Sequence, residues 1–600
     1  MSVRFQIPEC PPADVQQLRG ELGLSGAMAQ ILVRRGISDP ARARAFLSGG
    51  EEHSPACFSG IGAEVESISR HAAAGELITI HGDYDVDGMC STAVLLRTLR
   101  GLGGNVDFYL PDRASDGYGL NAGTVRRLAA RGTRLLVTVD CAITAVAEVA
   151  LARDLGMEVV VSDHHAPRAD GALPRALIVH PALCGYPCAE LCATAVAHKL
   201  AQALLDAGPD ARGGGANARQ ELLRERLEED LDLVALATIA DVVPLLGENR
   251  ALVRRGLRAL AGTRKPGLRA LMALAGVHPS KIDERSVAFA LAPRLNAAGR
   301  LYRADAGLEL IMTADPGRAE QIARELDRAN RERREIELRI RGQAEAQIKE
   351  LGERPAYVLA GEGWHAGVIG IVASRLAERN RRPVVLVALD GEIGKGSGRS
   401  IDAFDLLAGL TACEGHLLRY GGHRAAAGLE IERGRLDDFA VALATHAQSV
   451  LVADDLVPVE RVDAVVAGPE LGMELAEELR ALAPFGLGNP GVSLMVADAT
   501  FTDSRPMGEG RHVRFTVESQ GARARAVAFG TGGRLPVADG QPAEATFKLE
   551  INEWNGVSEP RLVLRQARPG RSSIAPAPTI AAPAPAEPEP LPELVLFSLP

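Results

Sequence analysis

The chain has 600 residues, too many for one hydrophobic core, and an ordinary domain size of about 100–200 residues predicts three or four compact units. Hydrophobic residues make up 46% of it and charged residues 24%, a balance that excludes a disordered or fibrous protein. The net charge of −10 argues against a protein that coats nucleic acid nonspecifically, because such binding needs a basic surface, although a local basic channel is compatible with it.

The thiols and the apolar segments indicate a cellular compartment. Eight cysteines are scattered along the chain, which fits reduced thiols better than a disulfide framework. The start, MSVRFQIPEC, lacks the apolar core of a signal peptide, and the most apolar segments, 231–246 and 356–360, are short or carry charges. We therefore expect a cytoplasmic protein without a membrane span.

Residues 1–70 are expected to form helices and loops, and they carry no motif that we can assign. From residue 76, apolar segments end in polar, glycine-rich or acidic turns and alternate with helical periodicity. The expected strands are 76–80, 106–110, 135–139 and 158–161, and the expected helices include 89–99 and 145–155. This alternation predicts an α/β domain with a mostly parallel, doubly wound sheet over 71–310. Ligands of such sheets bind beyond the carboxyl ends of the strands.

Four further regions follow. A long, highly charged run at 311–352 has apolar residues at helical spacing and predicts a connecting helix. A second α/β unit with glycine-rich turns is expected at 353–452. The region 453–570, with short strands at 512–517, 524–529 and 546–551, predicts a small β-barrel. The Pro- and Ala-rich tail, 571–600, is expected to be disordered, and its end, LPELVLFSLP, is either a partner-docking peptide or a frayed terminus.

Acidic clusters at successive strand and helix ends carry the strongest chemical signal. The first is HGDYDVDG, with His81, Asp83, Asp85 and Asp87 on one tight loop, and the others hold Asp140, the run Asp163-His164-His165, and Asp241. A single Asp at a strand end is usually a helix cap or a turn residue. Several such clusters together form an oxygen and imidazole site suited to Mn²⁺ or Mg²⁺, and two such ions can promote hydrolysis of a phosphoester.

These clusters resemble the four motifs of the DHH phosphoesterases. They read HGDYDVDG, TVDC, SDHH and IADVVPLLGENR, in the order and on the βα frame of that superfamily. Further motifs resemble the RecJ branch: LPDRASDGYGL, PRLNAAGR, GWHAGVIGIVASRL, GKGSGRS, GGHRAAAG, PFGLGNP and NEWNG, which together span about 80 to 560. The resemblance implies a DHH catalytic domain, a connecting helix, a DHH-associated domain that binds nucleic acid, and a C-terminal OB-like barrel.

The resemblance also implies roles for individual residues. Two metal ions would be held by Asp85, Asp87, Asp140, Asp163, His164 and Asp241. RecJ-like sequences vary at the position of His81, so two roles stay open for it: metal ligand or non-ligand. Asp83 would contact the metal ligands and not the metals themselves. His165 would contact the scissile phosphate or protonate the leaving oxygen.

Recognition of a DNA end needs residues that hold a terminal phosphate, and arginine suits this because its guanidinium can hold two phosphate oxygens. By resemblance, Arg113, Arg300, Ser397 and Arg399 form a 5′-phosphate pocket, while His423 and Arg424 face the phosphates of the strand. Aromatic residues are only 4% of the chain, so Phe515, Phe529 and Trp554 are the few candidates for base stacking, and each could equally be a core residue.

Two features depart from the family pattern. Ala142 stands where the family usually has glycine, and LCATAVAHKL at 191–200 replaces a more glycine-rich segment. We expect neither change to touch a metal ligand. Cys184, Cys188 and Cys192 recur at four-residue spacing, but Pro187 interrupts the helix that such spacing would need, so we expect no metal there.

The resemblance implies metal-dependent hydrolysis of single-stranded DNA from 5′ to 3′, with release of 5′-mononucleotides in recombination and repair. The partners it suggests are a single-stranded-DNA-binding protein and a helicase, and we expect a monomer. Two alternatives stay open: a DHH phosphodiesterase of short oligonucleotides or cyclic dinucleotides, and a catalytically inactive scaffold of DNA replication. Metal preference, processivity and RNA tolerance do not follow from the sequence.

Overall fold

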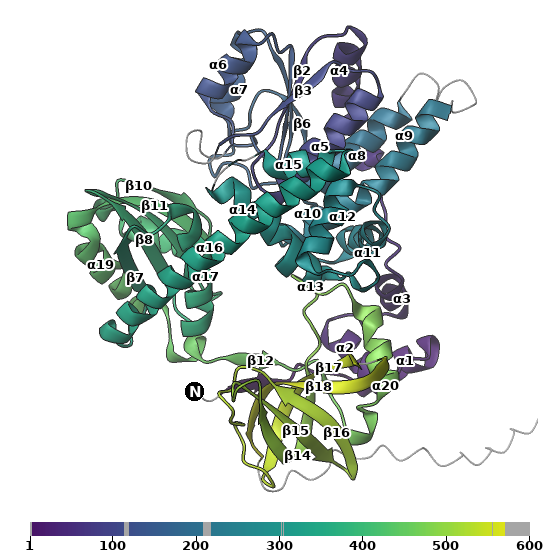
Figure 1. The fold of residues 1–600 in the computed structure, drawn as a ribbon, viewed down its shortest axis with the longest axis vertical. Helices are drawn as coiled ribbons and strands as arrows, with labels where there is room; N and C mark the ends of the chain where they lie inside the picture. The colour runs from purple at the N-terminus through teal and green to yellow at the C-terminus, as the bar shows by residue number, and fades with distance from the viewer. Residues whose placement is uncertain are drawn as a thin grey trace, which may run out of the picture. The chain divides into compact units, whose positions relative to one another are not determined.

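The computed structural model describes residues 3–112, 119–207, 218–301, 303, 305–554 and 556–570, the side chains of 298, 300, 301 and 554 excepted. It forms two compact units (Figure 1). The first comprises Met1–Ala464 together with Glu474–Val492, and the second comprises the described part of Val465–Met473 and Ser493–Pro600. The expected tail at 571–600 lies outside the described residues.

The N-terminal segment of the first unit is helical, as expected, and also contributes one strand. Its elements are β1 (Arg4–Gln6), α1 (Pro12–Leu22), α2 (Gly26–Arg34), α3 (Pro40–Ser48) and α4 (Ile61–Ala73). Strand β1 pairs in parallel with β12 (Val459–Arg461), a contact between distant parts of the chain that no local pattern predicts.

A five-stranded parallel sheet forms the centre of the half of this unit that contains the expected DHH catalytic domain, called the catalytic half below. Its strands are β2 (Ile78–His81), β3 (Val106–Tyr109), β4 (Leu135–Val139), β5 (Glu158–Ser162) and β6 (Leu177–Val179), in the order β3-β2-β4-β5-β6. The helices between them are α5 (Val86–Gly101), α6 (Ala122–Ala130) and α7 (Val146–Asp154), and α8 (Ala193–Asp206) follows β6. The predicted doubly wound sheet is therefore confirmed, and only the three-residue β6 was missed.

The strand order places one chain reversal beside β2. From β2 the chain goes to β3 on one side and then to β4 on the other, so the carboxyl ends of β2 and β4 flank a topological switch point. β2 and β4 are fully buried because helices cover both faces of the sheet, which explains their mainly apolar sequences. Loops that follow β2, β4 and β5 meet at this point, where ligands of doubly wound sheets bind.

A helical layer completes the catalytic half. Its helices are α9 (Ala218–Glu229), α10 (Leu231–Ala240), α11 (Gly247–Ala261), α12 (Pro266–Ala275), α13 (Glu284–Ser286), a π-helical turn (Val287–Leu291), α14 (Ala292–Leu301) and α15 (Ala306–Met312). The predicted connecting helix is α16 (Pro316–Leu351), continuous over 36 residues. Its first half buries Ile322 and Leu326 in the catalytic core, and its second half buries Ile340 and Ala344 against the next domain.

The second α/β domain has a mixed sheet in the order β10-β11-β9-β8-β7. Its elements are β7 (Tyr357–Glu362), α17 (Ala366–Asn380), β8 (Val384–Asp390), β9 (Ile393–Arg399), α18 (Leu406–Ala412), β10 (Arg419–Gly422), β11 (Ala426–Glu432) and α19 (Leu436–Val450). Glycines alternate along β9 because neighbouring side chains cross it: a Cβ on Gly394 or Gly396 would lie 2.5 Å from Val387 or Leu429.

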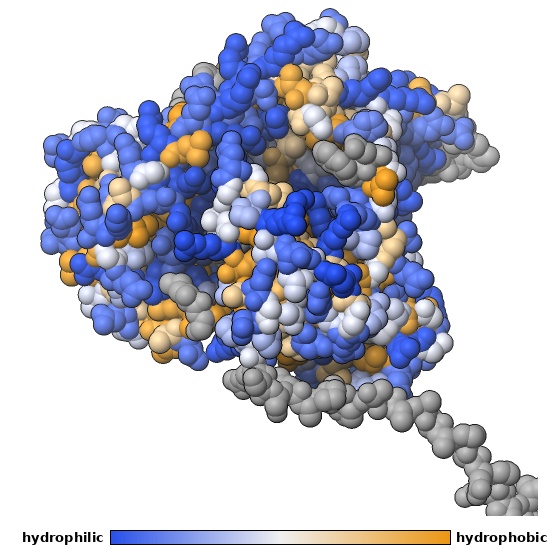
Figure 2. Space-filling view, turned by 60° about the horizontal axis from the view of Figure 1, so that its bottom comes forward, coloured by the Kyte–Doolittle hydropathy of each residue, from blue (hydrophilic) through white to orange (hydrophobic). Residues whose placement is uncertain are grey.

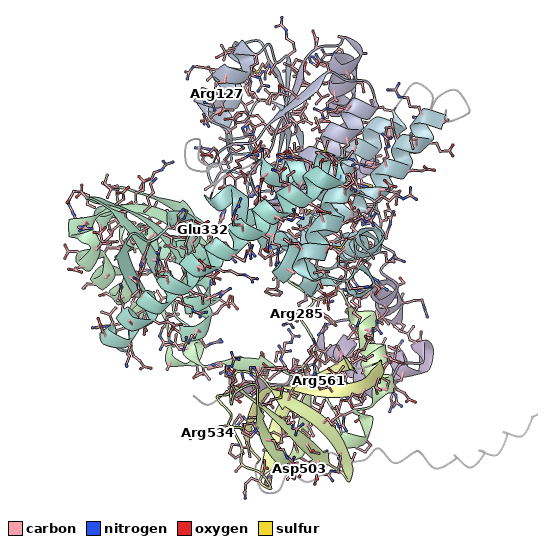
Figure 3. The ribbon with its side chains drawn as sticks, viewed as in Figure 1. Arg127, Arg285, Glu332, Asp503, Arg534 and Arg561 are labelled. Carbon is pink, nitrogen blue, oxygen red and sulfur yellow. The ribbon has the colours of Figure 1, made fainter. Side chains whose placement is uncertain are left out.

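The second unit is a β-barrel, as predicted. Its strands are β13 (Ala464–Val465), β14 (Leu494–Met507), β15 (His512–Ser519), β16 (Ala522–Ala528), β17 (Pro542–Trp554) and β18 (Val557–Pro569). Helix α20 (Met473–Leu479) lies between β13 and β14 in the chain, but from Glu474 on it belongs to the first unit. Pairing of β14 with β17 closes the barrel. Glu550 on β17 and Arg561 on β18 stand opposite each other and form a 2.6 Å ion pair (Arg561 is labelled in Figure 3).

The packing of the barrel core tests which of the expected aromatic residues can stack on nucleic-acid bases. Phe515 is only 4% exposed and packs edge-on against Phe501, with ring centroids 4.9 Å apart, so its use as a base-stacking residue is wrong. Phe529 is 51% exposed and stays a candidate. The side chain of Trp554 lies outside the described residues.

The surface carries scattered apolar side chains among hydrophilic ones on the face shown in Figure 2. Among the described residues, no helix has both the length and the apolar character that crossing a bilayer requires.

A buried ion pair ties the N-terminal segment to the catalytic half and provides a test of its packing. Lys199 donates to Glu248 (2.8 Å) and to the carbonyl of His53 (2.7 Å), and both charged side chains are at most 1% exposed. Removing the cation leaves the buried Glu248 carboxylate with neutral donors such as the backbone N–H of His53 (2.9 Å) but without the positive charge of Lys199. We predict that Lys199→Met lowers the free energy of unfolding by about 3–5 kcal/mol in urea titrations.

The exposed pair Arg224–Asp206 is the control, since its side chains are 42% and 52% exposed. Arg224→Met should change the unfolding free energy by less than about 1 kcal/mol. Equal effects of the two substitutions would contradict the assigned role of Lys199.

Candidate metal centre

The loop after β2 presents three aspartates and turns directly into a helix. Asp85 is the N-cap of α5, and its Oδ1 accepts hydrogen bonds from the backbone N–H groups of Asp87 (3.0 Å) and Gly88 (3.1 Å). A Cβ on Gly88 would lie 2.5 Å from the backbone nitrogen of Asp83, so only glycine fits there. The motif HGDYDVDG therefore encodes a loop folded tightly onto its own helix.

Asp87 is held by the N-terminus of α8. Its carboxylate accepts from the backbone N–H groups of Ala193 and Thr194 (2.7 Å each) and from the Thr194 hydroxyl (2.6 Å). The expectation that segment 191–200 does not touch a predicted ligand is therefore wrong. Helix N-termini favour carboxylates, and α8 fixes this one by three donors.

Helix α14 supports the same loop, a role that sequence reasoning missed. The side-chain oxygen of Asn296 accepts from the backbone N–H of Val86 (3.0 Å), between the two aspartates. A Cβ on Gly299 would lie 2.7 Å from the carbonyl oxygen of Tyr84, so the helix backbone reaches the loop only through glycine. The motif PRLNAAGR, which contains both residues, was the signal that could have revealed this support.

Strained backbone flanks the site. Asp140, Ala142 and Val242 adopt positive φ angles of 62°, 85° and 58°, a region that non-glycine residues rarely occupy. Asp140 follows β4, and Val242 follows Asp241 at the end of α10. Strain of this kind persists only where the surroundings determine the backbone, and it gathers at functional sites.

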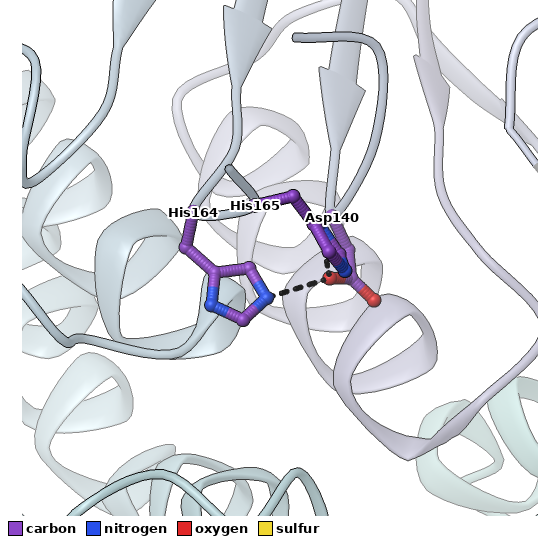
Figure 4. A group of neighbouring side chains, drawn as sticks. All are labelled: Asp140, His164 and His165. Atoms are coloured by element: carbon purple, nitrogen blue, oxygen red, sulfur yellow. Dashed lines mark ion pairs between the residues drawn. The ribbon is translucent and has the colours of Figure 1, made fainter. Parts of the chain in front are cut away.

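The paired histidines follow β5 and form ion pairs with Asp140 (Figure 4). Asp163 holds both histidines in place. Its Oδ1 accepts from the backbone N–H groups of His164 (2.7 Å) and His165 (3.1 Å) and from His165 Nδ1 (2.9 Å), while its Oδ2 accepts from the N–H of Ile143 (2.8 Å). Both oxygens of this predicted ligand are therefore engaged by protein donors.

His164 points into the acidic cluster. Its Nε2 lies 3.2 Å from Asp140 Oδ1, 3.7 Å from Asp241 Oδ2 and 3.8 Å from Asp87 Oδ2, and it has no hydrogen-bond partner among the described residues. A buried nitrogen that faces three carboxylates without a hydrogen bond has the chemistry of a metal ligand.

Three groups of potential ligand atoms can be recognised, and within each group the atoms lie within 4.8 Å of one another. They are Asp83, Asp85 and Asp140; Asp87, His164 and Asp241; and Asp140, His164 and His165. Asp140 and His164 are shared between groups, as expected for two neighbouring cations. Asp163 and His81 belong to none of them; His81 is fully buried, with Nδ1 3.6 Å from Cys141 Sγ.

The carboxylates destabilise one another's charged forms. Burial raises the pKa of Asp140 well above its usual range, and the charges of Asp87 and Asp85 raise it further. Burial and the same two charges raise the pKa of Asp241 to about 8. Ionised carboxylates this close together therefore need a compensating cation.

His165 has the opposite behaviour. Burial lowers its pKa, but the hydrogen bond and charge of Asp163 outweigh burial and raise the pKa to about 9. Burial also lowers the pKa of His164, which keeps that imidazole neutral at physiological pH. One histidine is therefore a neutral imidazole, the form that can bind a metal, and its neighbour is a cation.

The predicted phosphate-binding residues of the second domain lie together at one end of its sheet. Ser397 and Arg399 are on β9, and Arg399 donates to the Ser397 hydroxyl (3.1 Å). His423 and Arg424 are exposed on the turn between β10 and β11, whose Ala426 pairs with Arg399. A Cβ on Gly370 of α17 would lie 2.9 Å from Ser397 Oγ, so this glycine leaves room for the pair.

Two predicted residues of the pocket cannot be placed. Arg113 lies outside the described residues, and only the backbone of Arg300, in α14, is described. The structure therefore brings together four of the six predicted phosphate-binding residues.

All eight cysteines are free thiols. Cys184 donates to the carbonyl of Ile178, and Cys192 Sγ lies 3.3 Å from the Thr238 hydroxyl. The spaced cysteines thus make separate packing contacts.

Comparison with known families matches three parts of the chain. The DHH family, N-terminal domain, matches residues 77–238; the DHHA1 domain matches 353–448; and the RecJ OB domain matches 462–566.

Similar proteins extend over nearly the whole chain. The single-stranded-DNA-specific exonuclease RecJ of Bacillus subtilis is 36% identical over 574 residues, which cover 94% of this chain and 71% of the relative. The crystal structure of RecJ in complex with Mn²⁺ from Thermus thermophilus has a TM-score of 0.80 at 32% identity and covers 96% of this chain and 81% of that one. The Mg²⁺ complex of RecJ from the same organism has a TM-score of 0.75 at 30% identity, with coverages of 95% and 79%.

Ala142 provides a test of the strain beside Asp140. A glycine there adopts the positive φ without the steric cost of a Cβ. We predict that Ala142→Gly raises the free energy of unfolding by about 1 kcal/mol in thermal unfolding. Ala150→Gly, at an exposed position within α7, is the control and should lower it by about 0.5–1 kcal/mol. Destabilisation by both substitutions would contradict the strain.

The raised pKa of Asp241 predicts an unusual pH dependence. In metal-free protein the folded state holds a proton up to about pH 8 that the unfolded state releases near pH 4, its usual pKa being 3.8. The free energy of unfolding should therefore fall as pH rises from 4 to 8. Thermal unfolding in EDTA measures this slope, and Mn²⁺ should reverse the loss at high pH.

Asp241→Asn is the control, because it removes the titrating group. Its slope in EDTA should be shallower than that of the wild type. A slope unchanged by this substitution would contradict the assignment.

Proposed function

The chain belongs to the RecJ family of single-stranded-DNA-specific exonucleases, and on that premise we propose that it hydrolyses phosphodiester bonds of single-stranded DNA from 5′ to 3′ and releases 5′-mononucleotides. The observation that carries the proposal is the convergence of buried carboxylates on the unpartnered Nε2 of His164 at the switch point of the sheet. Such a site suits phosphoester hydrolysis, because two cations held there can bind both the attacking water and the phosphoryl group.

The metals proposed are Mn²⁺ or Mg²⁺, as in the two similar crystal structures, and two ions. The ligands proposed are Asp85, Asp87, Asp140, His164 and Asp241, all oxygen or imidazole donors that fit these ions. When bound, the ions lower the pKa of the attacking water and neutralise charge on the phosphoryl group. Asp83 and His81 are candidates for additional contacts.

His165 has the properties of the acid in the reaction. Its imidazolium is held over the site by Asp163, with a pKa of about 9, and its side chain is 38% exposed. We assign to it the contact with the scissile phosphate and donation of a proton to the leaving oxygen. Asp163, first predicted as a ligand, acts in this proposal by orienting both histidines.

The 5′ phosphate is proposed to bind Arg113, Arg300, Ser397 and Arg399, with His423 and Arg424 on the following phosphates. The position of four of these residues at one end of the sheet supports this proposal. There, β9 and the turn before β11 bring hydroxyl, guanidinium and imidazole groups together, from Ser397, Arg399, His423 and Arg424. Recognition of a phosphate at a chain end explains an exonuclease and not an endonuclease.

The setting proposed is DNA recombination and repair in the cytoplasm. Free thiols at all eight cysteines support a reducing compartment. A monomer, and assistance from a single-stranded-DNA-binding protein and a helicase, remain part of the proposal.

An end-labelling experiment tests the proposal. Full-length protein and Asp140→Asn are incubated with Mn²⁺ and single-stranded DNA labelled at either end, with and without a 5′ phosphate, and with a blunt duplex. We predict that the wild type releases mononucleotides progressively from the 5′ end of the single strand and that Asp140→Asn loses at least about 10³-fold of the rate.

The alternatives give different products. Release only from very short oligonucleotides would favour the phosphodiesterase of short substrates. Binding of the strand without cleavage by either protein would favour the scaffold. Equal cleavage of blunt duplex and single strand would contradict the proposed selectivity.

A further inference from the structure

The loop that carries Asp241 needs support from outside itself. Asp241 caps the C-terminus of α10, and the next residue, Val242, has a φ of 58° although it is β-branched. Residues 242–246 then lead into α11. A backbone in this region is unfavourable for valine, so the loop keeps its shape only if other contacts impose it.

The support comes from the segment 481–490, much later in the chain, which contains the motif PFGLGNP. The backbone N–H of Leu245 donates to the carbonyl of Leu487 (2.8 Å). A Cβ on Gly486 would lie 2.8 Å from Leu245, and one on Gly488 would lie 3.1 Å from Leu246. The glycines of the motif therefore allow backbone contact with the Asp241 loop.

Asn489 closes the segment on itself. It is 1% exposed, and its amide donates to the carbonyls of Leu482 (2.8 Å) and Pro484 (2.7 Å), while its oxygen accepts from Arg35 (2.6 Å). The backbones of Gly486 and Asn489 also pair with each other. This side chain fixes from within the shape that the segment presents to Leu245.

Arg250 fastens the segment to the helix that follows the Asp241 loop. It lies in α11, is 1% exposed, and donates to the carbonyls of Ala481 (2.9 Å) and Leu482 (2.8 Å). It also donates to the carbonyl of Phe46 (2.9 Å), whose ring lies 4.1 Å from the guanidinium carbon. A buried guanidinium is costly to desolvate, and these well-placed carbonyls offset that cost only in one arrangement.

The path of the chain also brings segment 481–490 to the first unit. The chain leaves the barrel unit after Met473 and returns to it at Ser493, so Glu474–Val492 is an excursion that belongs to the first unit. Ordering these residues costs conformational entropy, which their contacts with the catalytic half must offset.

We infer that segment 481–490, closed by Asn489 and fastened by Arg250, positions the Asp241 carboxylate in the metal centre. Asn489 is a positioning residue: it contacts no ligand, and it acts through Leu487 and the 242–246 loop. The inference rests on the proposed function, in which Asp241 holds a cation.

Mn²⁺ binding to the metal-free, full-length protein tests the inference, with free Mn²⁺ followed by electron paramagnetic resonance. Asn489→Ala should weaken binding of one of the two ions roughly 10- to 100-fold and leave the other unchanged, since loss of groups that orient a ligand has an effect of this size. Raising the Mn²⁺ concentration should restore its nuclease kcat. Asn380→Ala is the matched control, because Asn380 donates to a backbone carbonyl in α17 (2.8 Å), and it should bind as the wild type does.

Gly488→Ala perturbs the same contact from the other side, through Leu246, and should weaken the same ion. If Asn489→Ala does not melt cooperatively in EDTA, the Mn²⁺ isotherm of Gly488→Ala is used in its place to test the inference. A lower melting temperature with a wild-type Mn²⁺ isotherm would mean a purely structural role and overturn the inference alone. A wild-type chain that binds no Mn²⁺ would overturn the proposed function, and this inference with it.

Discussion

The mutual repulsion of buried carboxylates at one switch point is the constraint on which the rest of the structure depends. Asp83, Asp87 and Asp140 are buried, and the half-buried Asp85 and Asp241 lie beside them, so these carboxylates raise the free energy of one another's charged forms. A fold can hold such a group in two ways: by cations within it and by donors around it. The backbone N–H groups of α5 and α8 are donors that the chain supplies to Asp85 and Asp87.

The hydrogen-bond donors and the strained backbone together restrict the orientations that these carboxylates can adopt. Each carboxylate that is held by N–H groups can turn only its remaining lone pairs toward the centre. The positive φ angles of Asp140 and Val242 show that the backbone adopts an unfavourable conformation to aim these side chains. Such strain requires neighbours that leave no alternative, and α14 and segment 481–490 are neighbours of this kind.

The sequence predicted the elements and most of the centre because both have local signatures. β2, β4 and β5 were found because they are mostly buried and mainly apolar, β3 was found although it is only partly buried, and an acidic residue after each of β2, β4 and β5 located the site. The three-residue β6 and the pairing of β1 with β12 were not found, since very short strands have no period and pairing partners leave no local trace.

The sequence did not predict which atoms of the site face one another. Asp163 and His164 are adjacent, and no pattern distinguishes a carboxylate that accepts four protein hydrogen bonds from an imidazole that points at three carboxylates. The contact of α8 with Asp87 was hidden because its donors are mostly backbone groups, which nearly every residue has.

Charge is separated between two domains of the first unit in a way that suits a polyanionic substrate. The acidic centre repels DNA phosphates unless cations occupy it, and among the described residues the only positive side chain within its ligand groups is the imidazolium of His165. Attraction for the strand must therefore come from elsewhere, and the end of the β9–β11 sheet supplies guanidinium groups without nearby predicted ligands. A chain of net charge −10 thus keeps its acidic centre and the guanidinium groups of Arg399 and Arg424 in different domains, so in the proposed reaction metal binding and strand binding depend on different residues.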